Sequence, residues 1–257
     1  MLSKNRIKYI NSLKISKYRK LNAEFIVEGT KLTTELLQSN FQTSGIYATK
    51  EWLQENILFS KNIDCQEVDS KEMTQISNLT TPPGVLAVAG MPKIPFEPLS
   101  LESRFSLMLD GINDPGNLGT IIRTADWFGV DQIFCSPDTV DTYHPKVVQS
   151  TMGSIFRVKV IETDLIDVCR EAKKMQIDVF GAVMNGQNIY EIKLKRNSSV
   201  LIIGSESHGI RNYLLPFINF PITFPAYSAP GKENKAESLN ASVASALILS
   251  EFRRKMD

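Results

Sequence analysis

The sequence has few cysteines and no long apolar run, and both absences narrow what the chain can be. The three cysteines among 257 residues, Cys65, Cys135 and Cys169, are an odd number without the spacing of a zinc site. We therefore expect no metal, and reduced thiols in a cytoplasmic protein are the simplest account of them. No apolar run approaches the roughly 20 residues of a membrane-spanning helix, and residues 1–20 lack the apolar core of a secretory signal.

Charge is nearly balanced over the whole chain but is unevenly distributed. The formal net charge is +1, so the protein is not a polycation. The first twenty residues nevertheless contain no acidic residue, two tyrosines, and the basic residues Lys4, Arg6, Lys8, Lys14, Lys17, Arg19 and Lys20. A basic arm with aromatic rings suits an RNA backbone and exposed bases, and a solvated amphipathic helix explains the same pattern equally well.

The chain divides into two units around a proline-rich stretch. Short β-prone runs at 25–27, 45–48 and 85–89, with a helical pattern at 31–37, predict a small α/β unit. Three prolines within residues 91–100 exclude a regular helix or a central strand there. We therefore expect a first domain at 1–90, a linker at 91–104 and a second domain at 105–257.

The second unit alternates predicted strands with predicted helices. Strands are expected at 105–109, 132–135, 158–161, 179–183, 200–203 and 222–224, and helices at 118–128, 145–150, 164–175 and 240–254. This alternation is typical of an α/β domain whose parallel sheet is covered on both faces.

Polar residues follow the first strand of this unit. Asp114-Pro115-Gly116 has turn chemistry, Asn117 stands where a helix cap is expected, and Arg123 lies inside the following helix. A capped helix with one solvated arginine would explain these residues without any function. Their position beyond the carboxyl end of a strand favours a ligand site, because ligands bind at that edge of open α/β sheets.

Two further polar stretches follow later strands. Residues 204–209 run Gly-Ser-Glu-Ser-His-Gly, which is neither a Walker loop nor a dinucleotide fingerprint. Glu206 is expected to cap the next helix or to orient a polar ligand, and His208 is expected on the surface without a serine or aspartate partner of the catalytic-triad type. Ser238 and Asn240 precede the last helix as expected caps, which is an ordinary structural feature when taken alone.

Together the three stretches resemble a known family. Their order is Asn-Asp-Pro-x-Asn-x-Gly-x-x-x-Arg-Thr-Ala, then Gly-x-Glu-x-x-Gly, then Ser-Leu-Asn-x-Ser-x-Ala. This order resembles the SpoU-type (TrmH-like) branch of the SPOUT methyltransferases over about residues 105–255. The first unit resembles the small ribosomal-protein-like RNA-binding domain that is often fused to these enzymes.

The resemblance implies a fold, a cofactor and a reaction. It implies a parallel sheet with a deep trefoil knot, a homodimer formed through the last helix, and methyl transfer from S-adenosylmethionine to a ribose 2′-hydroxyl in structured RNA. It assigns the cofactor contacts to Gly204, Phe224 and Leu239. It assigns catalysis to five residues, Arg123, Asn117, Glu206, Ser238 and Asn240.

Within that set we expect Arg123 to hold the RNA phosphate and stabilise the developing oxyanion. A guanidinium with a pKa above about 12 is a poor general base, so literal deprotonation is disfavoured. The loop at 226–237 is longer than is usual in the family, and its Lys232 and Lys235 either contact RNA or are simply solvated.

Alternative functions are still open on the sequence alone. The two-domain layout favours ribosomal RNA over transfer RNA as substrate. A non-catalytic RNA-binding protein on the same fold is disfavoured, because Asn117, Arg123, Glu206 and Asn240 are all present. A nicotinamide-dependent oxidoreductase is disfavoured, because no glycine fingerprint follows an early strand.

Overall fold

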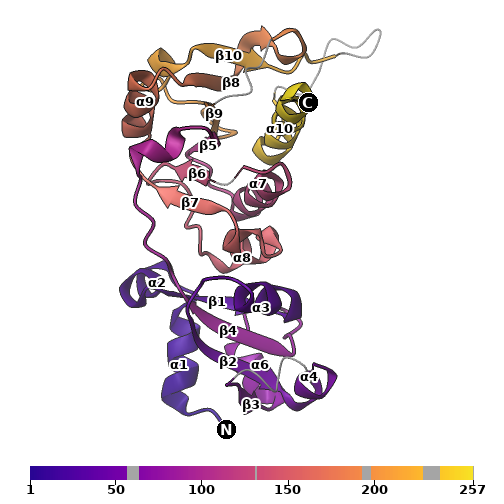
Figure 1. The fold of residues 1–257 in the computed structure, drawn as a ribbon. Helices are drawn as coiled ribbons and strands as arrows, with labels where there is room; N and C mark the ends of the chain where they lie inside the picture. The colour runs from indigo at the N-terminus through magenta and orange to yellow at the C-terminus, as the bar shows by residue number, and fades with distance from the viewer. Residues whose placement is uncertain (57–63, 131, 193–197, 228–237, 257) are drawn as a thin grey trace. The chain divides into compact units, whose positions relative to one another are not determined.

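The computed structural model describes residues 1–56, 64–130, 132–192, 198–227 and 238–256 (Figure 1). Contacts divide the chain into two units, Met1–Lys93 with Asp141–Arg157, and Ile94–Val140 with Val158–Asp257. The sequence-based boundaries differ from this division mainly at 141–157, a segment that the sequence predicts in the second domain and that packs with the first unit.

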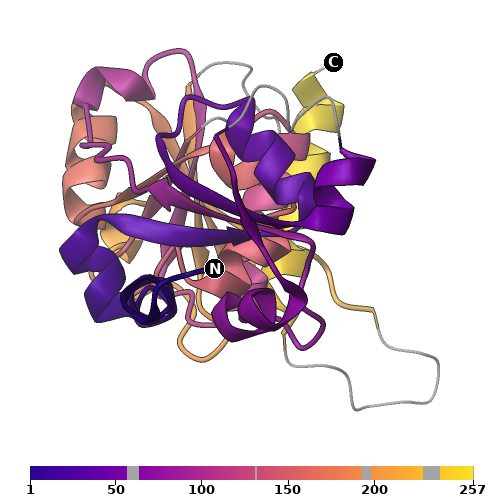
Figure 2. The ribbon, with the colours of Figure 1, turned by 90° about the horizontal axis from the view of Figure 1, so that it is seen from below.

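The first unit contains a mixed four-stranded sheet in the order β1-β4-β2-β3 (Figures 1 and 2). Its strands are β1 (Glu24–Glu28), β2 (Thr43–Thr49), β3 (Gln66–Val68) and β4 (Val85–Gly90). Strand β4 is antiparallel to β1 and β2, and β3 is parallel to β2. The helices are α1 (Lys4–Ser12), α2 (Ser16–Asn22), α3 (Thr30–Leu37), α4 (Lys50–Glu55), α6 (Ser70–Ile76) and α8 (Pro145–Thr151), with a 3₁₀ turn η2 (Ser154–Phe156).

Both faces of this sheet are buried, because alternate residues of each strand point to opposite sides. Val85 and Ala87 of β4 join a cluster that also contains residues of α3, α4 and α8. Leu86 and Val88 join a second cluster with residues of α1 and α6. Segment 141–157 contributes to the first cluster through Tyr143, whose ring centroid lies 4.6 Å from that of Phe25.

The basic N-terminal segment is folded into the helices α1 and α2, and RNA binding by this segment stays a prediction. Arg19 is only 1% exposed and forms an ion pair with Asp141 at 2.7 Å. Lys14 donates to the Ser77 carbonyl at 2.7 Å, and Arg6 contacts the ring of Tyr47. Three of the seven basic side chains therefore have partners within the unit.

The second unit is built on a six-stranded parallel sheet in the order β10-β8-β9-β5-β6-β7, which confirms the expected α/β class. Its strands are β5 (Phe105–Asp110), β6 (Gln132–Cys135), β7 (Lys159–Glu162), β8 (Asp178–Asn188), β9 (Ser199–Gly204) and β10 (Phe220–Thr223). Its helices are α7 (Pro115–Trp127), α9 (Leu165–Lys174) and α10 (Ala241–Met256), with 3₁₀ turns η1 (Pro98–Leu101), η3 (Ile189–Glu191) and η4 (Leu215–Phe217).

Helices α7 and α10 cover one face of the parallel sheet, and α9 covers the other (Figure 1). The ring of Phe252 on α10 stacks on Phe105 at 4.9 Å and meets Phe180 edge-on at 5.0 Å. Arg253 donates to the carbonyls of Phe128 and Gly129, so α10 also caps the C-terminal end of α7. This packing places the last helix of the chain beside the helix that follows β5.

Candidate active site

Two of the predicted polar stretches leave the sheet at the same edge. Asp110 ends β5 and Gly204 ends β9, and the two residues are register partners in adjacent parallel strands. The chain continues from Asp110 into the turn before α7, and from Gly204 into the loop 205–210. The polar residues after both strands therefore lie at the carboxyl edge of the sheet, where ligands bind in α/β folds.

Asn117 is not the cap of α7, contrary to the sequence prediction. Asp114 occupies the N-cap position, where its side chain accepts the backbone N–H of Asn117 at 2.8 Å. Pro115 follows as the first helical residue, which its fixed φ favours. Because Asp114 performs the capping, the amide side chain of Asn117 is available for contacts outside its own helix.

Three predicted site residues form one hydrogen-bonded cluster, although they are far apart in the chain. Asn117 Nδ2 donates to Glu206 Oε1 at 2.5 Å, and Asn240 Nδ2 donates to Asn117 Oδ1 at 3.0 Å. Asn240 Nδ2 also lies 3.5 Å from Glu206 Oε1. All three polar stretches therefore contribute one side chain to the same place.

Asn240 and Glu206 together cap α10. Asn240 Oδ1 accepts the backbone N–H of Ser242 at 3.0 Å and of Val243 at 3.3 Å, while Glu206 Oε1 accepts that of Ala241 at 3.2 Å. The predicted cap at Asn240 is confirmed, and Glu206 caps a helix as expected, although that helix comes 35 residues later. Ser238 is exposed and makes no hydrogen bond with the described residues, so the structure does not bring it into the cluster.

Arg123 lies on α7 but not in the cluster. It is six residues beyond Asn117, which is about 9 Å along a helix axis and on a different side of the helix. Its side chain is exposed and forms no hydrogen bond or ion pair with the described part of the chain. The guanidinium is thus available to bind an anion that does not belong to the cluster of Asn117, Glu206 and Asn240.

The three predicted cofactor residues lie at strand ends and at the entry to α10. A Cβ at Gly204 would lie 2.1 Å from the backbone of Gly209, so only glycine fits there. Phe224 follows β10 half-buried, with its ring 5.5 Å from that of Tyr190, and Leu239 is 47% exposed. Backbone groups beside half-exposed apolar side chains fit S-adenosylmethionine, because its aromatic adenine can pack on apolar side chains while its polar atoms bond to backbone groups. Lys232, Lys235 and most of the loop 226–237 lie outside the described residues.

Sequence reasoning missed an ion-pair network beside this edge. Arg211 Nε donates to Asp110 Oδ1 at 2.6 Å, and its Nη1 donates to Asp138 Oδ2 at 3.1 Å. The hydrogen bond with Asp110 raises the pKa of Arg211 above its usual value. Burial opposes ionisation of Asp138, but hydrogen bonds from Ser136 and Arg211 outweigh it and lower the pKa. The available signal was an aspartate that ends a strand and an arginine just after the glycine loop.

Other reactive groups do not form a second centre. His208 Nδ1 lies 2.7 Å from the Oγ of its sequence neighbour Ser207, and both side chains are exposed, as was expected for His208. Burial raises the pKa of Cys135 and of Cys169 to about 12, so both thiols stay protonated. Within the described residues, no cluster of His, Cys, Asp and Glu could hold a metal, and no helix could cross a membrane.

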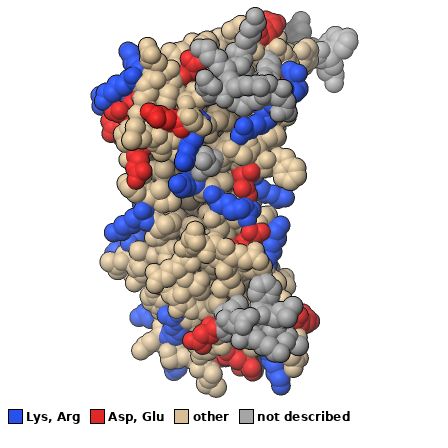
Figure 3. Space-filling model, in the orientation of Figure 1, with Lys and Arg blue, Asp and Glu red and all other residues tan. Residues whose placement is uncertain are grey.

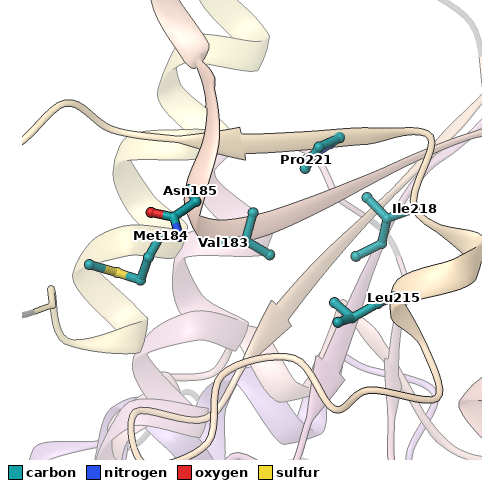
Figure 4. A pocket seen from close by; sticks show the side chains of 6 residues that line it. All are labelled: Val183, Met184, Asn185, Leu215, Ile218 and Pro221. Atoms are coloured by element: carbon teal, nitrogen blue, oxygen red, sulfur yellow. The ribbon is translucent and has the colours of Figure 1, made fainter.

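A cavity of about 360 Å³ lies elsewhere in the second unit, and none of its lining residues belongs to the predicted site (Figure 4). It is lined by Val183, Met184, Asn185, Leu215, Ile218 and Pro221.

On the face drawn in Figure 3, basic and acidic side chains are interspersed.

Both units match known protein families. Residues 104–250 match the SpoU rRNA methylase family, and residues 4–87 match the MRM3-like substrate binding domain. The first match spans the cluster of Asn117, Glu206 and Asn240 together with Arg123.

Individual proteins and structures are similar over nearly the whole chain. The 23S rRNA (guanosine(2553)-2′-O)-methyltransferase RlmP of Bacillus subtilis is 31% identical over 96% of each chain. The structure of a TrmH-family protein of Porphyromonas gingivalis has a TM-score of 0.86 and 36% identity over 99% of both chains. That of an rRNA methyltransferase of Sinorhizobium meliloti with bound S-adenosylmethionine has a TM-score of 0.85 and 26% identity, covering 99% of this chain and 96% of that one. The chain therefore belongs to the SpoU rRNA methylase family, and it is an S-adenosylmethionine-dependent RNA methyltransferase.

Proposed function

We propose that this protein transfers a methyl group from S-adenosylmethionine to a ribose 2′-hydroxyl of ribosomal RNA. The observation that carries the proposal is the convergence of Asn117, Glu206 and Asn240 at the carboxyl edge of the parallel sheet. The Bacillus subtilis relative, which is similar over 96% of its length, is named for 2′-O-methylation of a guanosine in 23S rRNA. Transfer RNA is the alternative substrate.

The reaction needs a positioned hydroxyl and stabilisation of its oxygen, while the hydroxyl proton passes to solvent and S-adenosylhomocysteine is the leaving group. When bound, S-adenosylmethionine supplies an electrophilic methyl group on a sulfonium. Arg123 holds the phosphate next to the reacting ribose and stabilises the charge that develops on the 2′ oxygen. Its exposure and lack of a partner among the described residues support this role.

The cluster provides the fixed geometry. Glu206 holds Asn117 through a 2.5 Å hydrogen bond and holds the start of α10 through the N–H of Ala241. Asn117 then orients the ribose, beside the amide of Asn240. Holding reactants in the reacting geometry can contribute about 7–11 kcal/mol to lowering the barrier.

Gly204, Phe224 and Leu239 would hold the cofactor, mainly through backbone groups. We propose that this region is knotted, as the resemblance to the family implies. The strand order of the parallel sheet and the overlap with the cofactor-bound structure from Sinorhizobium meliloti support this arrangement.

We also propose that two copies pair through α10. Val243 and Leu247 on this helix are 47% and 42% exposed, and such apolar side chains in a row favour burial against a partner. The first unit would bind the RNA, and its match to a substrate binding domain supports that role. A cytoplasmic location stays a prediction, supported by three free cysteines.

The direct test is ribose methylation in cells with and without the protein. Mass spectrometry of nuclease digests of ribosomal RNA should show one 2′-O-methyl nucleotide that disappears on deletion and returns with the wild-type gene. A return that also occurs with the Arg123→Ala variant would contradict catalysis by this site. Loss of a methyl group from transfer RNA instead would select the alternative substrate.

A further inference from the structure

Asp110 is a buried carboxylate that connects both ends of the loop carrying Glu206. Its backbone pairs with Gly204, where the loop begins, in the register of β5 and β9. Its side chain accepts the backbone N–H of Arg211, where the loop ends, at 2.8 Å through Oδ2. Asp110 is 1% exposed, so these contacts are shielded from water.

The guanidinium of Arg211 extends this connection to a third strand. It donates to Asp110 through Nε at 2.6 Å and also through Nη2. It reaches Asp138, in the turn after β6, through Nη1 at 3.1 Å and Nη2 at 3.0 Å. A planar guanidinium can make such paired contacts with two carboxylates, whereas an ammonium cannot.

The loop between these anchors is closed by a backbone contact of its own. Ser205 and Gly209 form a β-bridge, in which Gly209 N–H donates to the Ser205 carbonyl at 2.8 Å. Gly209 itself has a φ of +64°, a conformation that favours glycine. The position of Glu206 and of the loop's peptide groups therefore depends on how the two ends are held.

We propose that Asp110 and Arg211 are positioning residues for S-adenosylmethionine. They fix residues 204–211 in the one arrangement that presents Gly204 and Glu206 to the cofactor and to Asn117. This inference rests on the proposed function. Without the ion pair the loop samples other arrangements, and only the molecules in the competent arrangement bind the cofactor. The apparent Kd then equals the intrinsic Kd divided by the fraction of molecules in that arrangement.

This mechanism predicts that loss of the ion pair changes the Kd for the cofactor much more than it changes kcat. Arg211→Met and Asp110→Asn should raise the Kd for S-adenosylmethionine about tenfold if a tenth of the molecules hold the loop correctly. At saturating cofactor, kcat should change by less than about threefold, since the bound cofactor restores the arrangement. Arg211→Lys keeps the positive charge but loses the paired N–H donors of the guanidinium, so it should give an intermediate Kd.

The experiment is isothermal titration calorimetry of the full chain with S-adenosylmethionine, together with methylation kinetics and thermal unfolding. Asp138→Asn provides a milder variant that folds even if Asp110→Asn does not, because Asp138 is 56% exposed. It should raise the Kd by about two- to threefold. Arg170→Met is the matched control, because it removes an exposed arginine paired with Asp167 on α9 and should leave the Kd unchanged.

A double-mutant cycle makes the result decisive. Asp110→Asn with Arg211→Met should weaken binding no more than either single change, because both remove the same interaction. Folded variants with a lowered Tm but a wild-type Kd would overturn the inference and leave the proposed function standing. A wild-type protein that binds no S-adenosylmethionine would overturn both.

Discussion

Asn117 and Asn240 stand 123 residues apart in the chain and are joined by a hydrogen bond of 3.0 Å. The two amides are oriented by their other partners. Asn240 Oδ1 accepts from the first turn of α10, so its Nδ2 must face Asn117, and Asn117 Nδ2 faces the carboxylate of Glu206. The network thus fixes the orientation of both amide groups.

Removal of Glu206 should disrupt this network without unfolding the protein. Glu206→Ala leaves Asn117 and the N–H of Ala241 without their acceptor, and we expect kcat to fall about 100-fold because the reacting groups are misplaced. Glu206→Gln keeps a carbonyl oxygen and should lose less. Transfer of a tritiated methyl group to ribosomal RNA measures the effect, and equal losses in both variants would contradict a positioning role.

Arg123 should affect the chemical step rather than cofactor binding. We expect Arg123→Ala to lower kcat by about 10²–10³-fold, with the Kd for S-adenosylmethionine unchanged, since the side chain stabilises charge only as the reaction proceeds. Arg123→Lys should stay well below wild type. Near-full methyl transfer by the lysine variant would show that the proposed role is wrong. Arg170→Ala on α9 is the matched control.

A charge on the exposed apolar face of α10 should separate the proposed dimer. Leu247→Glu would bring one carboxylate from each copy into the symmetric interface. We therefore expect the dissociation constant of the dimer to rise at least tenfold, on the order of 1.4 kcal/mol or more. Sedimentation equilibrium measures the change. Leu99→Glu, at a leucine that is 72% exposed on η1, should leave association intact. If Leu247→Glu sediments like the wild type, α10 is not the interface.

The buried pair of Arg19 and Asp141 should stabilise the first unit in a pH-dependent way. Burial of Asp141 opposes ionisation, but hydrogen bonds from Arg19 prevail and lower its pKa. A lowered folded pKa means that the stabilisation is present above the unfolded value of about 3.9 and is lost as pH falls through the folded pKa. Arg19→Met should therefore cost about 3–5 kcal/mol near neutral pH.

Chemical denaturation at several pH values tests this expectation. The difference in unfolding free energy between the wild type and Asp141→Asn should be largest near pH 7 and should narrow below about pH 4. Lys174→Ala, which removes an exposed pair with Glu171, should change stability by less than about 1 kcal/mol. A difference that is constant with pH would show that the charge of Asp141 is not the source of stability.

The local sequence pattern was sufficient to predict most helices and strands of the second unit. The strand at 132–135 and the buried positions Leu165, Val168 and Ala172 of α9 follow directly from periodicity, and Gly129 ends α7 with a φ of +65° as its sequence position indicated. The first unit was harder to predict. The short elements α4, β3 and α6 were missed, because segments of three to seven residues carry too little periodic signal.

The α/β class and the residue types of the site could be predicted from the chain alone, because apolar periodicity and turn chemistry are local properties. Which polar groups meet depends on long-range packing. It gave the cap of α7 to Asp114, left Ser238 and Arg123 outside the cluster of Asn117, Glu206 and Asn240, and paired Asp110 with Arg211. These outcomes depend on the register of β5 with β9 and on the return of α10 to α7, and such long-range packing leaves no periodic trace in the chain.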